Sequence, residues 1–90
     1  MKAKTYSLIN YFDVWGSEEG WEVNDACTEF TDIQIADDAT DQDIIDYLYS
    51  IEFFNTNDIE KFIVEDLGNG WIEIYQKYDG KPLCSLRENV

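Results

Sequence analysis

The sequence predicts an α+β fold, in which an antiparallel β-sheet of about five strands carries one helix on one face. Segments with alternating apolar residues lie on both sides of a single segment with helical periodicity. Short turn sequences rich in glycine and asparagine separate the alternating segments. Because hairpins flank one helix, we expect the order β-β-(β)-α-β-β-β, in two layers and a single domain of residues 1–90.

Two strands, and part or all of a third, are expected before the helix. The first strand covers residues 4–15, KTYSLINYFDVW, where alternation places on one face Tyr6, Leu8, Phe12 and Val14. The GSEEG stretch at 16–20 predicts a turn into a second strand, whose half-buried side chains are Trp21, Val23 and Cys27. The DIQIA run at 32–36 either forms a third short strand or continues the second one after a bulge near 29–32.

The stretch ADDATDQDIIDYL, residues 36–48, predicts the helix, which we expect over about 41–52. Thr40 is a favourable N-cap, and Asp43 three residues later approximates a capping box. Apolar side chains recur at helical spacing at Ile44, Ile45, Leu48 and Ile51. The NTND stretch at 55–58 reads as the loop that leaves the helix.

Three strands are expected after the helix, at 59–67, 71–78 and 83–87. LGNGW at 67–71 is the strongest hairpin sequence in the chain, because asparagine and glycine tolerate the positive φ of a tight turn. YDGKP at 78–82 predicts the second turn.

The composition indicates a folded domain in the cytoplasm of the cell that makes it. Aromatic residues are 16% and hydrophobic residues 44% of the chain, which supplies the large side chains that a small core needs. No signal peptide or transmembrane segment is recognisable. We therefore expect Cys27 and Cys84 to be reduced and buried.

Acidic residues dominate the chain, with twenty Asp and Glu against six Lys and Arg and a net charge of −14. No basic residue occurs between Lys4 and Lys61, and fifteen acidic residues lie in that interval. A net charge of magnitude about 2–8 is enough for the solubility of a small domain. The excess argues against direct binding to nucleic acid or an anionic membrane and favours binding to a basic surface.

The residues for common catalytic and cofactor sites are missing. The chain has no histidine, which removes the commonest general base and the imidazole metal ligands. Two distant cysteines do not make a zinc site, and no glycine-rich phosphate loop is present. Acid pairs suited to glycoside hydrolysis arise by chance among twenty acids. We predict no enzyme activity, no cofactor and no metal site.

The aromatic side chains are predicted to form the core and, where exposed, to anchor a protein interface. A base-stacking platform for single-stranded nucleic acid would also need a basic groove. Tyrosine and tryptophan are enriched at interfaces. The candidates for such anchors are Tyr47, Tyr49, Trp15 and Trp71.

The acids near the start of the helix have a local explanation, because the helix dipole stabilises each by about 0.3–1 kcal/mol. That explanation does not cover Asp46 or the acids of the first hairpin. We therefore predict a partner-binding carboxylate surface built from the first hairpin and the helix. Its candidate residues are Glu18, Glu19, Glu22, Asp37, Asp38, Asp41, Asp43 and Asp46.

The stretches EEGWEVNDACTEF and ADDATDQDIID, together with the small size and the missing histidine, resemble the small acidic proteins of phages and mobile elements. That group includes DNA mimics and anti-CRISPR proteins. The resemblance implies that the protein occupies a nucleic-acid-binding site on a host defence or DNA-processing protein. The C-terminal third departs from a uniformly acidic mimic, since it contains Lys77, Lys81 and Arg87.

These observations lead to one functional hypothesis and two alternatives. The first is an acidic inhibitor or adaptor that binds a basic, nucleic-acid-binding protein. The second is a structural or regulatory protein that acts through a hydrophobic sheet face or as a homo-oligomer. The third is a divalent-cation site near residues 37–43, although that stretch lacks the glycine and glutamate positions of an EF-hand loop.

Overall fold

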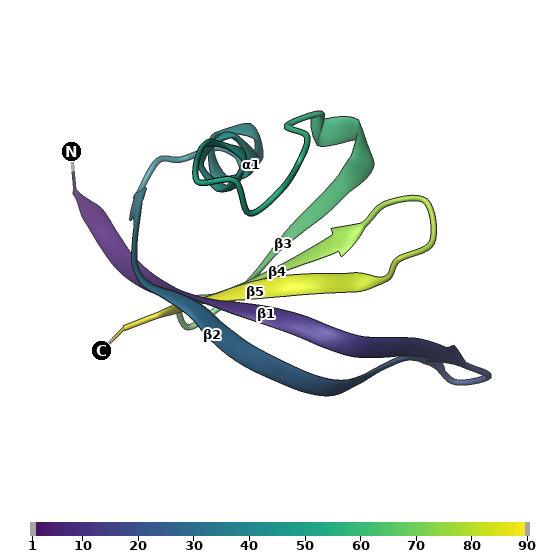
Figure 1. The fold of residues 1–90 in the computed structure, drawn as a ribbon. Helices are drawn as coiled ribbons and strands as arrows, with labels where there is room; N and C mark the ends of the chain where they lie inside the picture. The colour runs from purple at the N-terminus through teal and green to yellow at the C-terminus, as the bar shows by residue number, and fades with distance from the viewer. Residues whose placement is uncertain (1, 90) are drawn as a thin grey trace.

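The protein folds into one five-stranded antiparallel sheet with a single α-helix on one face, as the sequence predicts (Figure 1). The structure is a computed structural model and describes residues 2–89. Its elements are β1 (Ala3–Ser17), β2 (Gly20–Ala36), α1 (Asp41–Ser50), a 3-10 helix η1 (Ile59–Lys61), β3 (Phe62–Gly68), β4 (Trp71–Gln76) and β5 (Pro82–Glu88).

The strand order in the sheet is β2-β1-β5-β4-β3, so the C-terminal strand lies in the middle and β2 and β3 form the two edges. Each strand runs antiparallel to its neighbours. The helix packs over the face that presents Leu8, Ile33, Ile74 and Leu86, all of which are fully buried. We call the opposite side, which carries no helix, the open face.

The DIQIA run belongs to β2, and the predicted bulge is present. The pairing of β1 with β2 shifts register twice, once between Tyr6 and Leu8 and once between Leu8 and Ile9. On β2 these shifts fall between Thr28 and Ile33. Extra residues on one strand bend the ribbon and increase its twist, which lets a strand of seventeen residues curve around the core.

The hairpin of β1 and β2 extends beyond the rest of the sheet as a two-stranded arm (Figure 1). We call residues 12–25 the arm, because β5 pairs with β1 only as far as Asn10. Trp21 and Val23, which the alternation predicted as half-buried, are exposed there. Sequence alternation identifies a strand but does not say how far the neighbouring layer reaches, and the helix does not reach over the arm.

The helix begins as predicted. The Thr40 hydroxyl accepts a hydrogen bond from the Asp43 N–H, and the Asp43 carboxylate accepts one from the Thr40 N–H, at 3.1 and 3.0 Å. Ile44, Ile45 and Leu48 are buried against the sheet. The helix ends at Ser50, earlier than expected.

The predicted hairpin turn between β3 and β4 is present at Asn69 and Gly70. Both residues have positive φ, of 55° and 75°, as a type I′ turn requires. The first three residues of the strand expected at 59–67 instead form the short helix η1, which Asp58 caps by accepting a hydrogen bond from the Glu60 N–H.

The two cysteines are free thiols on either side of β1. Cys27 on β2 and Cys84 on β5 both pair in register with Asn10. Neighbouring strands lie about 4.8 Å apart, so the two residues are separated by about 10 Å, beyond the Cα separation of about 7 Å that a disulfide spans. Cys84 is buried as expected, whereas Cys27 is only half-buried.

Candidate functional site

The predicted acidic residues form two groups at opposite ends of β2. The tip group, Glu18, Glu19 and Glu22, lies at the turn of the arm, and the second group follows the end of β2 and continues into α1. A strand of this length spans roughly 50 Å when extended, comparable with the 44 Å longest dimension of the molecule. The structure therefore does not gather the eight predicted residues into one patch.

Three further exposed acids connect the two groups along the outer edge of the sheet: Asp25, Glu29 and Asp32 on β2. An edge strand presents unpaired backbone groups, and charged side chains on it discourage pairing with the edge of another molecule. These edge acids therefore have a structural explanation that needs no partner.

Two of the predicted acids have local roles in the helix. Asp43 forms half of the capping box. The Asp46 carboxylate accepts hydrogen bonds from the side-chain amides of Gln42 and Asn57, at 2.9 and 3.2 Å, and so ties α1 to the loop that leaves it. Both side chains contribute to local structure whether or not they also contact a partner.

The other six predicted acids are exposed, and their carboxylates make no hydrogen bond or ion pair with residues 2–89. They are the tip group and a turn group, Asp37, Asp38 and Asp41, which we define as the acids around the end of β2 and the first residue of α1.

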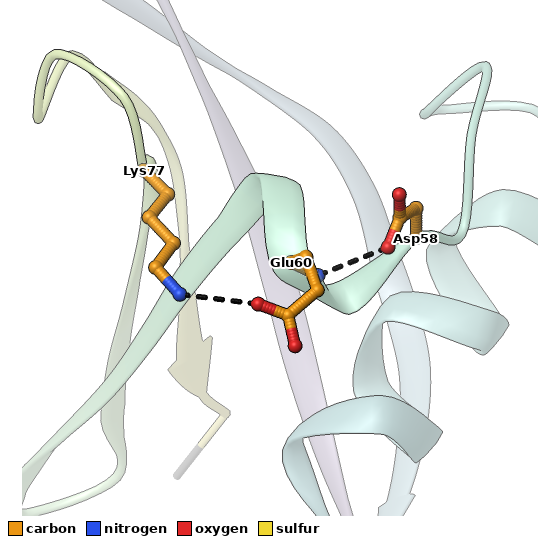
Figure 2. A network of polar contacts seen from close by, with 3 residues as sticks. All are labelled: Asp58, Glu60 and Lys77. Atoms are coloured by element: carbon orange, nitrogen blue, oxygen red, sulfur yellow. Dashed lines mark hydrogen bonds and ion pairs between the residues drawn. The ribbon is translucent and has the colours of Figure 1, made fainter.

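Internal neutralisation is sparse across the acidic interval. Of the fifteen acids between Lys4 and Lys61, all exposed, one forms an ion pair within residues 2–89: Glu60 accepts from Lys77 at 3.3 Å (Figure 2). The second ion pair of the described chain joins Lys4 and Glu88, at 3.7 Å. Tertiary folding therefore leaves most of the interval without the counter-charges that the local sequence lacks.

Three lysines lie close together around the β4–β5 turn. The Lys77 backbone N–H donates to the Lys61 carbonyl, and the Gln76 backbone N–H donates to the Lys81 carbonyl. They lie at or near a groove of about 650 Å³ whose apolar lining includes Phe54, Phe62 and Leu83. The β4–β5 turn therefore carries basic residues, and Trp21 of the arm contacts this same turn.

The open face carries a polar network that sequence reasoning missed. Glu73 on β4 is only 7% exposed, and its Oε1 accepts hydrogen bonds from the Tyr11 hydroxyl and the Trp71 indole N–H, both at 2.7 Å. The Arg87 guanidinium lies 3.8 Å from the centre of the Trp71 ring. Burial raises the pKa of Tyr11, and its contact with Glu73 acts in the same direction. The alternation of WIEIYQ was the available signal, because it places Glu73 between two aromatic residues on one face.

Three of the four predicted interface aromatics are exposed: Trp15, Tyr49 and Trp71. Tyr47 is half-buried and packs against the core. The structure adds Phe12, Trp21 and Tyr78 to the exposed aromatics. Trp21 nonetheless has a structural contact, because its indole N–H donates to the Asp79 carbonyl at 2.9 Å and fastens the arm to the β4–β5 turn.

Residues 2–89 contain no group of three or more Cys, Asp or Glu side chains placed to hold a metal ion. Within the same residues, the helices are too short and too polar to cross a membrane. The chain matches no family model, no curated protein and no solved structure with which it was compared.

Proposed function

We propose that the protein binds a basic protein in the cytoplasm, on a surface that otherwise holds nucleic acid, and acts as an inhibitor or adaptor. The observation that carries this proposal is the pair of exposed triplets, the tip group and the turn group, whose carboxylates have no partner within residues 2–89. Carboxylates close to one another repel, and a partner rich in lysine and arginine relieves that repulsion on binding.

The placement of the two groups favours an elongated basic groove over a compact basic patch. The longest dimension of the molecule is 44 Å, which corresponds to about a dozen base pairs at about 3.4 Å per pair. Consecutive acids along β2 are three or four residues apart, so they lie roughly 10–13 Å from one another in an extended strand. That spacing is sparser than duplex phosphate, and because residues three apart face opposite sides of a strand, basic side chains would meet these acids along the edge of the sheet.

The test compares three charge-matched variants in capture from a cell lysate at low salt. The first replaces the tip group (E18Q/E19Q/E22Q) and the second the turn group (D37N/D38N/D41N). The control, E52Q/D58N/E60Q, removes three exposed acids beyond α1 and keeps an acceptor at the η1 cap. The captured protein is then tested for binding to a labelled duplex in the presence of each variant.

The proposal expects the unmodified protein and the control to displace the duplex, with an efficiency that falls as salt rises. It expects each triple variant in the tip or turn group to lose at least about tenfold in apparent affinity. Equal binding by all three variants, or displacement that is insensitive to salt, contradicts the proposal.

A second candidate is self-association through the open face, favoured by the exposed Trp71 and Ile63 there. Sedimentation distinguishes the two candidates, because a salt-independent dimer that is lost in W71A supports this one. A monomer at all salt concentrations eliminates it.

A further inference from the structure

The two buried polar side chains of residues 2–89 are direct neighbours on the open face. Glu73 on β4 pairs in register with Ser85 on β5, and the two are 7% and 0% exposed. On its other side Glu73 pairs with Glu65 on β3. A buried carboxylate on a sheet face that no helix covers is unusual, because buried charges are normally paired.

Glu73 uses only one of its two carboxylate oxygens within the described chain. Tyr11 and Trp71 both donate to Oε1, whereas Oε2 has no hydrogen-bond partner. The neighbouring Ser85 Oγ is also buried and has no hydrogen-bond partner within residues 2–89. The nearly buried carboxylate of Glu73 therefore has one oxygen atom that accepts no hydrogen bond within residues 2–89.

A second acidic residue lies directly across from Glu73 on the neighbouring strand β3. Glu65 is exposed and occupies the position directly across from Glu73, where like charges destabilise a sheet. Neither carboxylate is in an ion pair within residues 2–89. A cation placed between the two would remove this repulsion.

One aromatic side chain lies on each side of Glu73 along β4. Trp71 and Tyr75 lie two residues before and after Glu73 on β4, so both rings stand on the same face. Trp71 already has a guanidinium over its ring, that of Arg87. Tyr75 is half-buried, and no cationic side chain of residues 2–89 lies over its ring. Its pKa is raised, chiefly by burial and then by the charges of Glu73 and Glu65.

We propose that Glu65, Glu73 and Tyr75 form a binding site for one arginine side chain of the basic protein partner. A guanidinium can donate to both carboxylates and stack on the tyrosine ring at once, whereas a lysine ammonium lacks the planar fork. The stacking of Arg87 on Trp71 shows this contact four residues before Tyr75 on the same strand. The site takes its partner from the proposed function but uses residues outside the tip and turn groups.

The test is an NMR titration with an amide-capped tetra-arginine peptide as the probe. The three indole N–H signals serve as reporters, because Trp71 donates to Glu73 whereas Trp21 donates to Asp79 and Trp15 belongs to the arm. We expect a saturable shift of the Trp71 signal that is larger than those of Trp15 and Trp21. The dissociation constant read from the Trp71 signal should rise by about fivefold in E65Q and by about tenfold or more in E73Q.

Matched variants keep the outcome decisive. E52Q removes one exposed acid outside the open face and should leave the Trp71 titration unchanged. If E73Q fails to fold by circular dichroism, E65Q decides, because Glu65 is exposed. Unchanged affinity in E65Q, equal shifts at all three indoles, or an equal constant for tetra-lysine overturns the inference.

The two proposals fail separately. A silent Trp71 signal, with duplex displacement that still depends on the tip and turn groups, rejects the arginine site and leaves the proposed function standing. A Trp71 titration that depends on Glu65, together with duplex displacement that is unchanged in the tip-group and turn-group variants, supports the arginine site and rejects the proposed function.

Discussion

Replacing Asp43 by alanine should destabilise the protein, whereas replacing Asp38 by alanine should not, although each change removes one exposed carboxylate near the start of α1. Asp43 accepts a hydrogen bond from the Thr40 N–H at 3.0 Å and lies in the first turn of the helix. Asp38 is exposed and its carboxylate makes no hydrogen bond within residues 2–89. Both variants reduce the acidic repulsion, so their difference isolates the local role of Asp43.

The expected magnitude follows from these two contributions. The exposed capping hydrogen bond is worth about 0.5–1.5 kcal/mol and the carboxylate in the dipole field about 0.3–1 kcal/mol. Alanine recovers part of this through its better helix propensity, roughly 0.5 kcal/mol. D43A should therefore destabilise by about 1 kcal/mol, whereas D38A should be neutral within about 0.5 kcal/mol or slightly stabilising.

Urea denaturation followed by far-UV circular dichroism measures the difference. For a small domain with an m-value of about 1–3 kcal/mol per molar urea, the midpoint of D43A should fall by about 0.3–1 M. D43N keeps an acceptor for the Thr40 N–H, so it should recover the stability contributed by the hydrogen bond but not the part contributed by the charge in the helix dipole. Equal midpoints for D43A and D38A, at low and at high salt, would refute the argument that Asp43 acts through the cap.

Three further results are expected. L48A should lose about 2–5 kcal/mol of unfolding free energy, because Leu48 is fully buried, whereas I63A on the exposed β3 edge should lose less than about 1 kcal/mol in the same denaturation experiment. The pKa values of Tyr11 and Cys84 are raised in the folded state, mainly by burial, above their ordinary values of 10.0 and 9.0. Their contribution to stability is therefore complete below about pH 9 and is lost as the pH rises above it. A series of melting temperatures at alkaline pH would show this loss, and in C84A the loss should begin at a higher pH. In native protein a thiol reagent should modify Cys27 and leave Cys84 unmodified, with no intramolecular disulfide detected by mass spectrometry after mild oxidation.

The helix and the tight turns were predictable from the sequence because their causes are local. Thr40 and Asp43 satisfy the first free N–H groups of α1 across three residues. Asn69 and Gly70 accept the positive φ that a two-residue turn needs. In each case the residues that stabilise the conformation lie next to one another in the chain.

The layout of the candidate site was not predictable in the same way. The predicted acids are near in sequence, yet β2 holds the tip group and the turn group at opposite ends of the molecule. The open-face cluster required the pairing of β3, β4 and β5, since Glu65, Glu73 and Ser85 are brought together by strand register alone. Burial of Glu73 also depends on Tyr11, sixty-two positions away.

The sequence by itself determined the class of fold, the start of the helix, the turns and the absence of basic residues between Lys4 and Lys61. These features depend on local conformational preference and on composition. Only the tertiary structure decided which acids remain without a counter-charge and which carboxylate is buried on the open face. The physical reason is that ion pairing, burial and cross-strand register join residues far apart in the chain, and their pairing is set by the path of the strands.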